Sequence, residues 1–138
     1  MLNGSPHSSG VNDLALREME AVFKENGVET EIVQVGNVAV RGCAACGACA
    51  KLGKCIFDDI VNEIAPKFEE ADGLVVSSQY WNSIHGNNAS EADQDEEGKQ
   101  TMRALARNMT FLMKSIALGK ETYGLPEKEV RKGTNFIR

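Results

Sequence analysis

The stretch before position 13 constrains the fold of this chain more than any other. It reads Leu-Asn-Gly-Ser-Pro-His-Ser-Ser-Gly-Val-Asn and leads directly into a helical pattern. A loop of small residues at a helix start leaves backbone N–H groups unpaired and directed at one point, and Ser5, Ser8 and Ser9 can add hydroxyl donors. This pattern indicates a phosphate site. The ordinary alternative is a serine-rich loop that only caps the helix.

Three segments repeat apolar residues at helical spacing. The first, residues 12–26, is expected to begin at Asn12 as N-cap and to end at Asn26-Gly27. The second begins after Asp58 or Asp59, and Pro66 within it should kink it or mark a new first turn. The third spans roughly residues 95–119 and is expected to end at Gly119 or Gly124.

Only two segments have a clear strand pattern, residues 28–35 and residues 73–78. A doubly wound parallel sheet normally needs about five to six strands. A strand, a helix and a strand in this order would form a βαβ unit, so we predict an α/β fold whose parallel sheet is reduced or incomplete. The 138 residues suit one domain, 1–138, whose tail, 125–138, runs over the surface.

Composition excludes several classes of function. The net charge of −5 argues against a nucleic-acid partner. No apolar run reaches membrane-spanning length and no signal peptide opens the chain, so a cytoplasmic location without membrane contact is expected.

Four cysteines follow the spacing Cys43-x2-Cys46-x2-Cys49-x5-Cys55. Short gaps of this kind let one loop supply several thiolates to an iron–sulfur cluster. Zinc also takes four thiolates, although its sites usually pair two knuckles across a longer gap. The third alternative is a set of reduced thiols with structural or redox roles.

The motif Asn-Gly-Ser-Pro-His, together with the cysteine run, resembles sequences of the NADPH-dependent FMN reductase and iron–sulfur flavoprotein families. The resemblance implies a flavodoxin-like three-layer sandwich, bound FMN, NAD(P)H as substrate and a homo-oligomer, and it implies a [4Fe–4S] cluster as one role of the cysteines. By position, it implies that Ser5 and His7 contact the FMN phosphate. It also implies that the helix start presents its backbone there, at Gly10, Val11 and Asn12.

The chain departs from the family pattern in two places. Only two residues precede the first loop, where the family has a strand. Residues 75–78 fuse a middle segment of the family with a late one, which looks like an internal deletion of the central flavin loops. The residues after the fusion, Tyr80, Trp81 and Asn82, are then expected near the flavin ring; the alternative is that the two aromatic residues lie in the core or an interface.

The deletion has a consequence for assembly. Loss of strands and helices from a parallel sheet should expose apolar surface, and such surface drives association. The helix at 95–119, with its stripe from Met102 to Ile116, is expected at the contact between copies.

The function that the resemblance implies is an FMN-dependent NAD(P)H oxidoreductase that passes electrons to a small-molecule or protein acceptor. No catalytic side chain is assigned, because the flavin carries the chemistry. The alternatives are a non-catalytic iron–sulfur or zinc-binding electron-transfer module and an inactive remnant.

Overall fold

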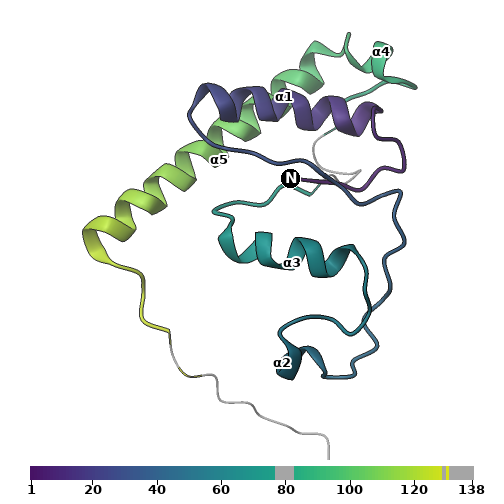
Figure 1. Ribbon diagram of the computed structural model, residues 1–138. Coiled ribbons are helices and arrows are strands. Elements are labelled where there is room, and N and C mark those ends of the chain that lie inside the picture. The colour runs from purple at the N-terminus through teal and green to yellow at the C-terminus, as the bar shows by residue number, and fades with distance from the viewer. Residues whose placement is uncertain (77–82, 129, 131–138) are drawn as a thin grey trace, which may run out of the picture.

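The fold is a thin layer of parallel strands with helices on both sides (Figure 1). A computed structural model of the chain describes residues 1–76, 83–128 and 130. The elements in chain order are β1 (Leu2–Asn3), α1 (Val11–Glu25), β2 (Val33–Gln34), α2 (Cys49–Leu52), α3 (Ile60–Glu70), α4 (Ala89–Ala92) and α5 (Glu96–Tyr123). Helices α1 and α5 lie on one side of the strands and α3 lies on the other. The predicted α/β class is confirmed.

The strand β1 occupies the centre of the sheet. Leu2 pairs in parallel with Val33 of β2 and, on its other side, with Val76 in an isolated bridge. The backbone N–H of Leu2 donates to the carbonyl of Val75 at 2.8 Å. The order is therefore second, first, third, which is the order at the start of a doubly wound sheet.

The strands are shorter than the sequence pattern predicts. The predicted strand 28–35 is regular only at Val33–Gln34, and in the described part of the predicted strand 73–78 only Val76 makes a bridge. The expectation that the first strand is nearly absent is met by the two residues of β1. Each neighbour can pair only as far as the central strand runs, and β1 has two residues.

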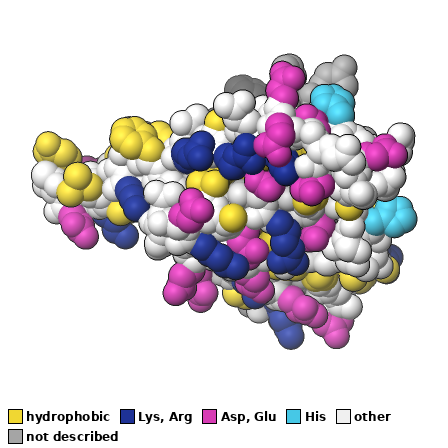
Figure 2. Space-filling view, turned by 90° about the horizontal axis from the view of Figure 1, so that it is seen from above, with side chains coloured by type: hydrophobic (Ala, Val, Ile, Leu, Met, Phe, Trp, Pro, Cys, Tyr) yellow, Lys and Arg dark blue, Asp and Glu magenta, His cyan; other side chains and the backbone are white. Residues whose placement is uncertain are grey.

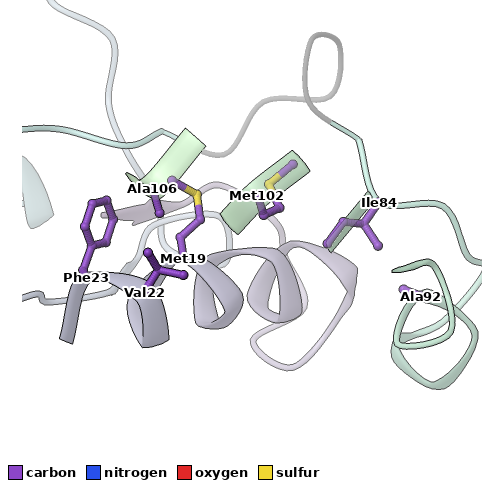
Figure 3. Packing of buried hydrophobic residues seen from close by; sticks show 7 residues of the cluster. All are labelled: Met19, Val22, Phe23, Ile84, Ala92, Met102 and Ala106. Carbon is purple, nitrogen blue, oxygen red and sulfur yellow. The ribbon is translucent and has the colours of Figure 1, made fainter. Parts of the chain in front are cut away.

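The core lies between α1 and α5 (Figure 3). The side chain of Met19 is 1% exposed. A partly buried ion pair, Glu18 with Arg103 at 3.0 Å, also joins the two helices. The buried cluster comprises Met19, Val22, Phe23, Ile84, Ala92, Met102 and Ala106.

Helix boundaries follow the predicted pattern closely, and two of the predicted caps are confirmed. Asp59 caps α3 by accepting from the backbone N–H of Val61 at 3.0 Å, and Gly27 has the left-handed φ of +71° just after α1. The prediction that Asn12 caps α1 is wrong, because Gly10 holds that position. Helix α5 continues past Gly119 and ends at Gly124. None of the helices in the described part has the length and apolar character needed to cross a membrane.

The predicted apolar stripe of α5 divides into two halves. Met102 is buried in the chain's own core, whereas Leu112 and Ile116 are 56% and 62% exposed. With 28 residues, α5 is about 42 Å long, and the 15 residues of α1 cover only about 22 Å. The expectation that the whole stripe lies at a contact between copies is therefore wrong for its first half.

Candidate functional site

The loop between β1 and α1, residues 4–10, lies where a parallel strand ends and a helix begins. Gly10 is the N-cap of α1, and as a glycine it has no side chain that could accept a capping hydrogen bond. Its carbonyl accepts from the backbone N–H of Leu14 at 3.1 Å, which starts the helical ladder. The N–H groups of the first turn are left at the positive end of the helix dipole, without a side-chain cap. This combination suits an anion.

The loop has a defined internal structure. The Oδ1 of Asn3 accepts from the backbone N–H of Ser5 at 3.0 Å, and the Oγ of Ser5 accepts from the backbone N–H of His7 at 3.1 Å. The Cβ of His7 lies beside Gly10, since a Cβ added to Gly10 would meet it at 3.3 Å. The structure thus places His7 next to the start of α1.

Strand β2 and the turn after it contact this loop. The amide of Gln34 donates to the carbonyl of Ser5. Gly36 approaches so closely that a Cβ there would lie within 3.0 Å of the backbone of Gly4 and Ser5. Only a residue without a side chain fits this approach.

The five residues that the resemblance assigned to the phosphate all lie in this loop and the first turn of α1. His7 is exposed, and the others are half-buried: Ser5, Gly10, Val11 and Asn12. Asn12 is the second residue of α1, so its backbone, and not a capping side chain, is what it can offer to an anion. The predicted ring contacts Tyr80, Trp81 and Asn82 lie outside the described residues.

The cysteine loop is wound tightly. Ala45, Gly47 and Gly53 have left-handed φ values of 52°, 69° and 68°. The backbone N–H of Ala45 donates to the Sγ of Cys43 at 3.4 Å, a contact of the kind that tunes thiolates bound to iron.

The thiols themselves are dispersed. Cys43, Cys46 and Cys49 are exposed, and Cys55 is half-buried. No three side chains of the metal-binding types gather at one point within the described residues. As arranged here, the four thiols do not fit a cluster or a tetrahedral zinc ion.

Several residues that shape these two loops carried no functional signal in the sequence. Gln34 lay in the predicted strand 28–35, and Gly36 was predicted only as part of a turn. A Gly-Asn pair directly after a strand is the one signal that could have drawn attention to Gly36.

The model of the NADPH-dependent FMN reductase family matches residues 1–86. The chain belongs to this family. The matched part contains β1, the loop at the start of α1 and the cysteine loop, and the family accounts for the order of the strands. The fold of this FMN reductase family member is therefore flavodoxin-like, with a reduced parallel sheet.

Curated relatives of this family member are iron–sulfur flavoproteins. One from Methanocaldococcus jannaschii and one from Methanosarcina thermophila are each 36% identical over 80 residues, which is 58% of this chain and 42% of the relative. One from Archaeoglobus fulgidus is 32% identical over 82 residues, 56% of this chain and 36% of the relative. The chain thus spans about two-fifths of the length of these proteins. No solved structure matches it.

Proposed function

We propose that this chain binds FMN and acts as an NAD(P)H-dependent oxidoreductase. The observation that carries the proposal is the first turn of α1, which follows the carboxyl end of β1 and has no side-chain cap. The chain's membership of the FMN reductase family supports FMN as the ligand. Bound FMN would supply a ring that accepts hydride from a nicotinamide and passes electrons to a small-molecule or protein acceptor.

The residues of the loop would hold the phosphate of the flavin. Backbone N–H groups at the start of α1 would donate to its oxygens, and the Ser5 hydroxyl would add a donor while it accepts from His7. His7, whose Cβ lies beside the position of Gly10, would bring an imidazole N–H donor close to the phosphate.

Binding of FMN to the full chain tests the phosphate assignment, with quenching of flavin fluorescence as the readout. Ser5→Ala combined with His7→Ala should weaken FMN binding by at least about tenfold, which is 1.4 kcal/mol. Ser115→Ala combined with His85→Ala changes the same residue types outside the loop and should leave binding unchanged. Equal affinity in the double mutant and the wild type would reject the assignment.

Turnover tests the oxidoreductase itself. With saturating FMN, the chain should oxidise NADH or NADPH faster than free FMN does, and a comparison of the two shows which donor it uses. Trp81→Ala should change the circular dichroism of bound flavin if the 80–82 segment contacts the ring. A rate equal to that of free FMN would reject the activity and favour a binding role.

A second candidate function is electron transfer by an iron–sulfur cluster on the cysteine loop. The hydrogen bond from Ala45 to Cys43 and the names of the relatives favour it, although binding would require the exposed thiols to draw together. Anaerobic reconstitution followed by absorption spectroscopy and metal assays separates the alternatives: iron with a broad brown absorption, zinc without colour, or thiols without metal. Full iron content in Cys55→Ser would remove Cys55 as a ligand.

A further inference from the structure

Two amide side chains on adjacent strands hold the backbone of Ser5. The Oδ1 of Asn3 accepts from the backbone N–H of Ser5 at 3.0 Å, and the Nε2 of Gln34 donates to the carbonyl of Ser5. Asn3 and Gln34 are direct partners in the parallel ladder of β1 and β2. We name these two side chains the amide clamp, because together they engage both backbone polar groups of Ser5.

Asn3 lowers the stability of the place where it is buried. It is 0% exposed, and its Nδ2 has no hydrogen-bond partner among the described residues. A buried amide donor without a partner destabilises a fold, and an apolar side chain of similar size would avoid that loss. Within the described part of the chain, the hydrogen bond of this side chain goes to Ser5. The amide of Asn3 therefore contributes to the position of the loop more than to the stability of the core.

The clamp is fixed to the sheet, whereas the loop that it holds is open to solvent. The carbonyl of Asn3 accepts from the backbone N–H groups of Val35 at 2.9 Å and of Gly36 at 3.1 Å. The loop of residues 4–10 is dark purple at the right of Figure 1, and Figure 2 shows the two histidines of the chain, one of which is His7, on the surface toward the same end. Side chains locked by the sheet beneath an exposed loop can hold that loop in one geometry for a ligand.

We propose that Asn3 and Gln34 are positioning residues that set Ser5 for the phosphate of FMN. The inference rests on the proposed function, in which the Ser5 hydroxyl and the start of α1 hold this phosphate. Each amide acts through the backbone of Ser5 and does not itself contact the ligand. A shift of this backbone displaces the Ser5 Oγ, which also accepts from the N–H of His7 at 3.1 Å, so the donors of the loop no longer meet at one point.

Affinities of the full chain for FMN and for riboflavin, which lacks the phosphate, test the proposal through quenching of flavin fluorescence. Asn3→Leu and Gln34→Met remove the amides at similar size, and each should weaken FMN binding by at least about tenfold while riboflavin binding stays unchanged. Asn3→Ser keeps a hydroxyl that can accept from the N–H two residues later, so it should retain part of the FMN affinity that Asn3→Leu loses. Gln94→Met is the matched control, since Gln94 donates to the carbonyl of Ser90 at 3.3 Å outside the loop, and it should change neither affinity.

Thermal melting without flavin separates positioning from a structural role. The Tm of Asn3→Leu should stay within about 3 °C of the wild-type value, because the loss of the bond to Ser5 is offset by the loss of the unpaired donor. A large fall in Tm in both Asn3→Leu and Gln34→Met, or equal weakening of FMN and riboflavin binding, would overturn the proposal.

The double variant Ser5→Ala with His7→Ala separates this inference from the phosphate assignment. If that variant loses FMN affinity while Asn3→Leu and Gln34→Met keep it, the phosphate site stands and the role of the amide clamp is rejected. A wild type that binds no FMN would overturn both.

Discussion

Asn62 of α3 holds the backbone of Cys55 on both sides. Its Oδ1 accepts from the N–H of Cys55 at 2.8 Å, and its Nδ2 donates to the carbonyl of Cys55 at 3.1 Å. The same Nδ2 donates to the carbonyl of Phe57 at 3.1 Å. One side chain therefore fixes the last cysteine of the loop to a helix, whereas the other three cysteines are exposed.

Asn62→Ala should release this end of the loop. The lost hydrogen bonds should cost about 1–3 kcal/mol of local stability, and the alkylation rate of the half-buried Cys55 thiol should rise about tenfold for each 1.4 kcal/mol. Peptide mapping after a short iodoacetamide pulse measures Cys55 separately from the other cysteines. Asn37→Ala, at an exposed turn position, is the control, and an unchanged Cys55 rate in Asn62→Ala would contradict the role of Asn62.

Gly36→Ala should disturb the loop of residues 4–10, although Gly36 lies outside this loop in the sequence. The new Cβ would lie within 3.0 Å of the backbone of Gly4 and Ser5, so the loop must shift, at a cost of about 1–3 kcal/mol of stability. We expect weaker FMN binding and a lower Tm. Gly119→Ala meets open space within α5 and should instead stabilise the chain by up to about 1 kcal/mol. Unchanged FMN affinity in Gly36→Ala would mean that the position of the loop does not matter for binding.

Met19→Ala should destabilise the fold by about 2–5 kcal/mol, because Met19 is 1% exposed between α1 and α5 and its truncation leaves a cavity. Chemical denaturation followed by circular dichroism measures the loss. Leu118→Ala, at a side chain that is 65% exposed, should change the free energy of unfolding by no more than about 0.5 kcal/mol. Similar losses in the two variants would show that the α1–α5 contact is not the main core.

Asp95, the N-cap of α5, should make the stability of the fold depend on pH. Its carboxylate accepts from the backbone N–H of Gly98 at 2.9 Å and of His85 at 2.7 Å, and these bonds lower its pKa from the ordinary value of 3.8. A lowered pKa in the folded state contributes stability above pH 3.8, which is lost as the pH falls through the folded-state pKa.

The Tm difference between wild type and Asp95→Ala should therefore be full near neutral pH and should shrink as the pH falls below 3.8. Asp58→Ala, at an exposed position, is the control and should show a smaller difference at neutral pH. A Tm difference for Asp95→Ala that does not shrink in acid below pH 3.8 would contradict this assignment.

The sequence by itself determined the features that depend on neighbours along the chain. Helical periodicity and local caps predicted α1, α3 and α5 to within a few residues, because the groups that end a helix, such as Asp59 and Gly27, lie next to it. The short motif at positions 3–7 predicted the family and the α/β class, which the match over residues 1–86 confirms.

Only the tertiary structure decided the features that depend on partners far apart in sequence. Leu2 pairs with Val33 and Val76, and neither register nor strand length can be known before these segments meet. The division of the α5 stripe into a buried and an exposed half follows from the length of α1 on the other side of the contact. Hydrogen bonds and burial between segments far apart in sequence depend on which surfaces pack together. Local sequence patterns do not predict that packing.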